Sequence, residues 1–302
     1  MLHRLEELYY IVDNFCKEFE PIYKRYLLLD VKRKLRNRQT QVSLSEMLCL
    51  LIMFQSSRMR DFKSFYYFIS REMRRAFPKL CSYQRFIELM PRAIPVLIVL
   101  LNCLYESCDG TSFVDSSAIK ACHIKREKRH KVFKGIAKKS KSSMGWYYGF
   151  KLHVIVNKKG ELISANFSLA DVDDREGLLN MCKKIFGDVI GDKGYIGQNL
   201  KTILKHRDIN LITRGRKNMK NHILSAKDKA LLAARNIVET VIGQLKHGCQ
   251  IEHTRHRSLN GLIINVLCAL ICYCFYHHKS SKRTDLCTKL QIKNIKPSIC
   301  NA

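Results

Sequence analysis

The chain has 302 residues, of which 46% are hydrophobic, enough to bury the core of one or two domains. Its 54 Lys and Arg outnumber its 26 Asp and Glu, and the formal net charge of +28 favours a polyanionic partner, nucleic acid before an anionic membrane surface. The 13 cysteines are odd in number, in a long chain without a signal-peptide pattern, which argues against a disulfide framework and predicts reduced core thiols.

The N-terminal third of the chain is predicted to be helical. Ser43 followed by Glu46 forms a capping-box pattern in front of an apolar run, which predicts the start of a helix. A second helix is expected over 62–76, and a third over 82–104 that its two prolines break or kink. Residues 1–110 are therefore expected to form a helical domain, either a helix-turn-helix DNA reader or a plain helical bundle.

Strand patterns follow the helical third. Residues 113–117, FVDSS, place Asp115 in a short run of strand formers that ends in hydroxyl side chains. The basic stretch 120–145 is predicted to be either a mobile loop or an arm that becomes ordered on DNA. Residues 147–156 and 161–169 are predicted to be two strands joined in a hairpin.

Helices and strands then alternate. A helix over 175–186 is expected to lead into a strand that ends at Asp192, in the sequence DVIGD. A helix over 197–206 is expected to lead into a strand over 209–213. This order predicts an α/β domain with a mixed sheet.

Two helical segments are predicted near the C-terminal end. The segment 226–246 has one apolar stripe, and Arg235, Glu239 and Lys246 lie on a separate stripe that is either a surface salt-bridge ladder or a functional face. The apolar stretch 262–276 is shorter than the roughly 20 residues that cross a bilayer, so a core helix is expected there.

Asp115, Asp192 and Glu239 are three acids on three separate elements, which is the ligand set that a hard divalent cation needs. The acids between residues 171 and 176 are expected to cap the helix that follows them. The glycines of the chain match neither dinucleotide nor P-loop spacing, so no nucleotide cofactor is expected.

Several motifs, in order along the chain, carry a resemblance to a known family. They are FVDSS, GWYYGFKLH at 145–153, DVDDR at 171–175, GDKGY at 191–195, RKNMKN at 216–221, the Arg235, Glu239 and Lys246 pattern, and HTRHRS at 253–258. Together they resemble the DDE transposases, most closely those of the bacterial insertion sequence 982 family. The resemblance extends from about residue 40 to residue 276.

The resemblance implies a domain organisation. Residues 111–276 are expected to form an RNase H-like catalytic domain, preceded by the helical domain 1–110 and followed by a poorly ordered basic tail, 277–302. It also implies that the first acid lies on the first strand, the second on the fourth strand and the third on a later helix.

The resemblance further implies metal-dependent phosphoryl transfer. Two Mg²⁺ or Mn²⁺ ions held by Asp115, Asp192 and Glu239 are expected to promote cleavage at the ends of an insertion sequence and strand transfer to target DNA. The expected DNA contacts are Lys246, Arg235, Lys151, His153, Lys193, Arg216, Lys217, Arg255 and Arg257.

Two other functions stay open on the sequence. An RNase H-like nuclease would share the acids but stop after hydrolysis, and a non-catalytic DNA-binding protein of a decayed element would bind without cutting. Leu232 stands where the wider family signature often has a tyrosine. The expected setting is the bacterial cytoplasm, at the nucleoid, with a homodimer or higher oligomer on DNA and no membrane partner.

Overall fold

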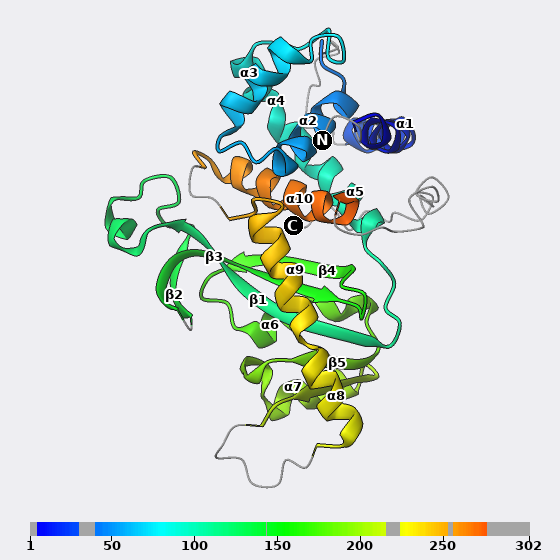
Figure 1. The fold of residues 1–302 in the computed structure, drawn as a ribbon, viewed down its shortest axis with the longest axis vertical. Coiled ribbons are helices and arrows are strands. Elements are labelled where there is room, and N and C mark those ends of the chain that lie inside the picture. The colour runs from blue at the N-terminus through cyan, green and yellow to red at the C-terminus, as the bar shows by residue number, and fades with distance from the viewer. Residues whose placement is uncertain (1–4, 30–39, 143, 216–223, 253–255, 277–302) are drawn as a thin grey trace. The chain divides into compact units, whose positions relative to one another are not determined.

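The computed structural model describes residues 5–29, 40–142, 144–215, 224–252 and 256–276. The chain divides into two compact units (Figure 1). A helical unit contains residues 1–104 and 260–302, and a sheet unit contains residues 105–259.

The described part of the helical unit consists of helices. They are α1 (Leu5–Leu29), α2 (Leu44–Ser56), α3 (Phe62–Glu72), α4 (Tyr83–Leu89), a 3₁₀ turn (Met90–Ala93), α5 (Ile94–Leu104) and α10 (Leu259–Tyr276). The capping box predicted at α2 is confirmed: the Ser43 side chain accepts from the Glu46 N–H at 3.1 Å, and the Glu46 carboxylate accepts from the Ser43 N–H at 2.7 Å.

The predicted third helix is interrupted, as its prolines indicated. Pro91 lies in the 3₁₀ turn between α4 and α5, where its missing N–H interrupts the helical hydrogen bonds. Within the described residues, the stretch Tyr83–Leu104 is long and apolar enough to cross a bilayer, a test that core helices also pass. Leu97 and Leu100 of α5 are both fully buried, which fits a core helix.

α10 is the apolar core helix that the sequence predicted. Ile271 and Cys272 are among its fully buried residues. Contacts group α10 with the N-terminal helices, whereas the predicted catalytic range 111–276 included it. No local pattern predicts this grouping, because it depends on long-range contacts. α10 packs against helices some 200 residues earlier in the chain, and one such contact joins Gln55 and Asn265, 210 residues apart.

Replacing Asn265 with leucine is expected to destabilise the helical unit by about 1–3 kcal/mol, because the hydrogen bond that the buried Gln55 amide donates to Asn265 Oδ1 at 3.1 Å is lost. Denaturant unfolding followed by circular dichroism measures the change. The double variant Gln55→Leu/Asn265→Leu is expected to recover part of the loss, since both polar partners are then removed. A double variant less stable than the sum of the two single changes would contradict this account.

The described part of the sheet unit has one mixed sheet, as predicted, but with six strands instead of the five expected, because a further strand forms within the basic stretch. The strands are β1 (Thr111–Cys122), β2 (Lys138–Ser142), β3 (Gly145–Val156), β4 (Leu162–Leu169), β5 (Gly187–Gly191) and β6 (Ile209–Thr213). Their order is β2-β3-β1-β5-β6, and β4 pairs with β3 (Figure 1). The predicted hairpin is confirmed as the antiparallel pair β3 and β4, while β5 pairs in parallel with β1 and β6.

Helices cover both faces of this sheet. They are α6 (Asp174–Met181), α7 (Gln198–Lys205), α8 (Ala226–Ala234) and α9 (Asn236–His247). α9, yellow in Figure 1, crosses β1 and β3 on one face. α6 packs on β3 and β4, and there Gly177 lies against the His153 ring. Asp115 faces α9, and the next residue, Ser116, faces the other side of the sheet because side chains alternate along a strand. Ser116 pairs with His153, so His153 and the helix α6 that covers it lie on the face opposite α9.

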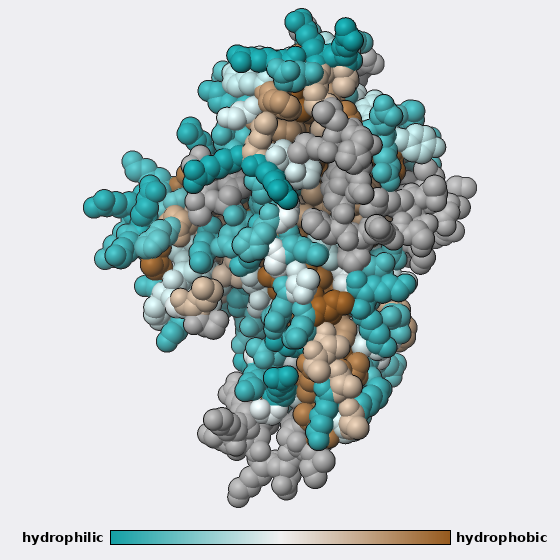
Figure 2. All heavy atoms as spheres, viewed as in Figure 1, coloured by the Kyte–Doolittle hydropathy of each residue, from teal (hydrophilic) through white to brown (hydrophobic). Residues whose placement is uncertain are grey.

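The basic stretch predicted to be mobile is folded, which corrects that expectation. The stretch contains the end of β1, a 3₁₀ turn (Ile124–Arg129) and β2, and we call residues 123–142 the basic arm. Phe133 anchors the arm: its ring is 1% exposed and lies 5.5 Å from the Phe150 ring. Figure 2 shows mainly hydrophilic side chains over the arm, at the left of the view, interrupted by hydrophobic residues.

Candidate active site

Asp115 lies in the middle of β1. β1 pairs in parallel with β5, where Phe113 faces Ile190. Two residues further along the two strands stand Asp115 and Asp192, and Asp192 continues the extended backbone beyond β5, with ψ of 176°. Side chains two residues apart on a strand share a face. The register therefore places the first two predicted acids next to each other on one face of the sheet.

Glu239 reaches the same place from the first turn of α9. Arg235 stands at the break between α8 and α9, where its Nη1 lies 3.3 Å from Asp115 Oδ2 and its Nη2 donates to Glu239 Oε1. The guanidinium thus links a strand acid to a helix acid 124 positions apart in the sequence. The Arg235 and Glu239 pair is part of this cluster, so a surface salt-bridge ladder alone does not describe it.

The other two carboxylates act electrostatically on Asp115. Burial raises the pKa of Asp115 to about 6, and the charges of Asp192 and Glu239 act in the same direction. The Ser116 N–H, which donates to Asp115 Oδ1 at 2.7 Å, and the Arg235 guanidinium oppose this rise. Such a group of like charges is stabilised by a shared cation.

A divalent cation fits this site in donor chemistry and in charge. Three carboxylates offer the hard oxygen ligands that Mg²⁺ prefers. In the present arrangement Arg235 supplies the positive charge, and among the described residues no three His, Cys, Asp or Glu side chains are yet gathered as a metal cage. Glu239 is 52% exposed, so its side chain has room to turn from Arg235 toward Asp115.

The opposite face of the sheet holds a second polar cluster. His153 is fully buried, with Nε2 3.0 Å from Ser168 Oγ, and burial lowers its pKa to about 4. Lys151 lies 3.2 Å from Asp174 Oδ1 and donates to a backbone carbonyl at 2.8 Å. Both residues were predicted to contact DNA. A neutral ring without exposed surface cannot do so, and the 14% exposed Lys151 side chain is committed to internal partners, so the structure corrects these two assignments.

Replacing Gly177 with alanine is expected to lower the stability of the sheet unit by about 1–3 kcal/mol. The new Cβ would lie 2.5 to 2.8 Å from three atoms of the His153 ring, which is buried and cannot withdraw. This clash outweighs the roughly 1 kcal/mol that alanine gains over glycine within a helix. Thermal unfolding measures the effect, with Gly243→Ala in α9 as the control. The Cβ added there meets nothing within 4 Å, so the Tm of the control variant should stay unchanged or rise. Equal Tm values for the two variants would contradict the expectation.

The remaining predicted DNA contacts are spread over the sheet unit. Lys246, in the last turn of α9, lies 3.1 Å from Glu252 Oε2. Lys193 and Arg257 are exposed. Arg216, Lys217 and Arg255 lie outside the described residues.

The capping role expected of the acids between residues 171 and 176 is confirmed at Asp173. Asp173 caps α6 by accepting from the Arg175 N–H at 2.9 Å. The Arg175 side chain also donates to Asp173, which lowers the pKa of Asp173 to about 2. Asp109 accepts from the Thr111 N–H at 3.2 Å in the turn before β1. Asp173 and Asp109 are therefore occupied by local backbone contacts.

Tyr195 was not singled out from the sequence, although it stands in the GDKGY motif. It is 1% exposed, and its ring lies 2.9 Å from the place of a Cβ on Gly191. Burial raises the pKa of Tyr195 well above its usual value, so its hydroxyl stays protonated. A glycine directly before Asp192 therefore makes room for an aromatic ring that supports the turn carrying the second acid.

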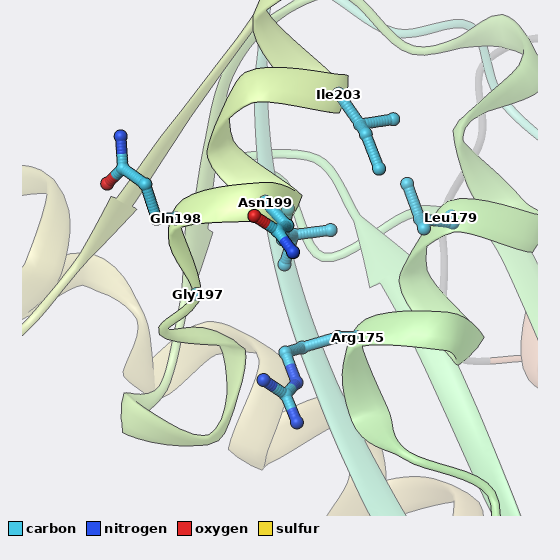
Figure 3. Close-up of a pocket in the computed structure, with 7 residues that line it drawn as sticks. Arg175, Leu179, Gly197, Gln198, Asn199 and Ile203 are labelled. Atoms are coloured by element: carbon cyan, nitrogen blue, oxygen red, sulfur yellow. The ribbon is translucent and has the colours of Figure 1, made fainter.

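A hollow of about 370 Å³ lies between α6 and α7 (Figure 3). Leu179 and Ile203 point toward one another across it, and the Gln198 side chain points away. Arg175 lines the hollow, but its guanidinium is held by Asp173. None of the three predicted acids lines this hollow, so it is separate from the carboxylate cluster.

Comparison with known proteins supplies the family. The family model of a transposase DDE domain matches residues 105–259, which is just over half of the chain and coincides with the sheet unit. Among curated proteins, none matches significantly. A cryo-EM structure of a piggyBac transposase synaptic complex with hairpin DNA is similar at a TM-score of 0.46 and 10% identity, over 90% of this chain and 78% of that one.

The matched segment contains Asp115, Asp192 and Glu239, together with the sheet and the helix that carry them. On the extent of this match, the chain belongs to the family of transposases with a DDE domain.

Proposed function

We propose that this protein is the transposase of a bacterial insertion sequence, which cuts DNA at the ends of its element and joins them to target DNA. The observation that carries the proposal is the convergence of Asp115, Asp192 and Glu239 within the DDE domain. The order and spacing of the motifs favour the insertion sequence 982 family in particular.

The three carboxylates would hold two Mg²⁺ or Mn²⁺ ions, which would activate the attacking hydroxyl and stabilise the leaving oxygen of an in-line displacement. Asp115 is held for this task by its strand and by the Ser116 N–H. Arg235 keeps Glu239 beside Asp115. With Glu239 acting as a metal ligand, the guanidinium would be free to donate to a DNA phosphate.

The proposed substrates are the terminal repeats of the element and a target DNA. The net charge of +28 supports binding to a polyanion, and exposed cations such as Lys193 and Arg257 are candidate contacts on the sheet unit. Because two ends must be joined, we propose a homodimer or higher oligomer on DNA, acting at the nucleoid in the cytoplasm. The helical unit is proposed to bind DNA as well.

A strand-transfer assay tests the proposal. The full chain is incubated with a labelled DNA fragment that carries an element end, a target plasmid and Mg²⁺ or Mn²⁺. A transposase nicks the end and joins it to the plasmid. Cutting without joining would support the nuclease alternative, and binding without cutting would support the non-catalytic one.

A further inference from the structure

Trp146 is the only tryptophan of the chain and is 57% exposed, although tryptophan is usually largely buried. It is the second residue of β3, at the end of the hairpin with β2. Its neighbours two and four positions on, Tyr148 and Phe150, share its face of the strand but are only 6% and 2% exposed.

The basic arm explains why the three rings differ. Phe133 packs edge-on against Phe150 with ring centroids 5.5 Å apart, and its carbonyl accepts from the Tyr148 hydroxyl at 2.9 Å. The His130 ring adds to the cover over Tyr148, with centroid distances of 5.4 Å to Phe133 and 6.0 Å to Tyr148. The cover contributed by these arm residues stops short of Trp146. The exposed ring is therefore the uncovered end of an aromatic row.

The uncovered ring is surrounded by positive charge. Lys139 Nζ lies 5.1 Å from the centroid of the Trp146 ring, and Lys141 pairs with Trp146 in the β2 and β3 register. Every Lys and Arg between residues 125 and 141 is exposed, and Glu127 is the one acid in that stretch. An exposed indole among cations is a stacking surface for a flat ligand that carries negative charge.

Unpaired nucleotides have this chemistry, because each offers a flat base beside a phosphate. In a duplex the base faces are stacked on one another and only their edges are accessible. We propose that Trp146 stacks on an unpaired DNA base while Lys139 and Lys141 hold the adjoining phosphates. The proposal rests on the proposed function, since unpaired bases arise at DNA ends that are opened or cut.

The single tryptophan makes a direct test possible, because all indole emission comes from Trp146. The full chain is titrated without divalent metal, so that nothing is cut, with a single-stranded oligonucleotide and with a blunt duplex of the same sequence. Single strands are expected to quench the emission, and the duplex to quench it much less. Trp146→Ala is expected to weaken single-strand binding about 5- to 150-fold, measured by fluorescence anisotropy of labelled DNA.

Matched variants separate stacking from charge and from misfolding. Trp146→Phe should restore part of the affinity, since phenylalanine also stacks. Phe186→Ala is the control, because Phe186 is 53% exposed but lies next to Gly110, at the other end of β1 from the arm. It should bind single strands like the wild type, and duplex affinity should stay within about twofold in all three variants.

Unchanged emission at saturating single-stranded DNA, or equal binding by Trp146→Ala, would overturn the proposal. So would an emission change that depends on protein concentration alone, which would assign the ring to contact with a second copy. The titration needs neither metal nor cleavage. If the protein binds single strands through Trp146 but cuts no DNA, only the proposed function is contradicted.

Discussion

Asp115→Asn is expected to reduce metal-dependent cleavage and strand transfer by more than about 100-fold, the scale lost with single groups that stabilise a transition state. Asparagine keeps the shape of the side chain but removes the charge that Arg235 and a divalent cation would share. Asp192→Asn and Glu239→Gln are expected to behave alike, because all three carboxylates belong to one cluster.

The loss should not come from unfolding. Burial raises the pKa of Asp115 from 3.8 to about 6, so the folded protein disfavours the charged carboxylate above pH 6. Asparagine removes that unfavourable charge. Tm of Asp115→Asn at pH 7 is therefore expected to equal or exceed that of the wild type, and any gain should vanish as the pH falls below the ordinary pKa of 3.8, where the wild-type carboxyl is protonated in both states.

Asp188→Asn is the matched control for these assays. Asp188 lies on β5, four residues before Asp192, but it pairs with Lys227 at 2.8 Å and with Asn210 at 2.9 Å. It should keep wild-type cleavage, since it is not in the carboxylate cluster. Binding of Mn²⁺ measured by calorimetry gives a second readout, in which Asp115→Asn loses affinity and Asp188→Asn does not. Full cleavage by Asp115→Asn would contradict the assignment of the site.

Local rules explain what the sequence predicted well. The helix start at Ser43 depends on contacts within four residues, and the hairpin of β3 and β4 on alternation and one turn. Asp115 and Asp192 could be singled out because each stands in or directly after a strand-forming run. Patterns that need only neighbouring residues are visible in a single sequence.

Long-range packing explains what the sequence did not predict. His153 looks like a surface cation in the sequence, and only the approach of Gly177 on α6 shows that it is buried. The link from Arg235 to Asp115 crosses 120 residues, and the break between α8 and α9 that allows it falls inside one continuous apolar pattern. The basic arm has the composition of a mobile loop, but the pairing of β2 with β3 and the buried Phe133 ring fix it to β3.

Phe133→Ala is expected to have the largest effect on stability, about 3–5 kcal/mol, which is typical when a buried phenylalanine is truncated. The ring is 1% exposed and touches both His130 and Phe150. The arm has few other apolar anchors, since Val132 and Ile136 on either side are 39% and 37% exposed. Without the ring, the arm should open before the sheet does.

Thermal unfolding measures the loss of stability, and hydrogen exchange measures the opening of the arm. Val132→Ala is the matched control, because it truncates the adjacent but exposed side chain, and it should change stability by no more than about 0.5 kcal/mol. In Phe133→Ala, amides of residues 123–137 should exchange faster, whereas those of β1 near Asp115 should stay protected. Similar losses in the two variants would show that the arm is held by something other than this ring. If the arm opens as expected, Tyr148 becomes a second exposed ring of the aromatic row. Phe133→Ala then loses arm stability but keeps Trp146, whereas Trp146→Ala loses the ring but keeps the arm. Comparing the two variants therefore separates single-strand binding at Trp146 from arm stability.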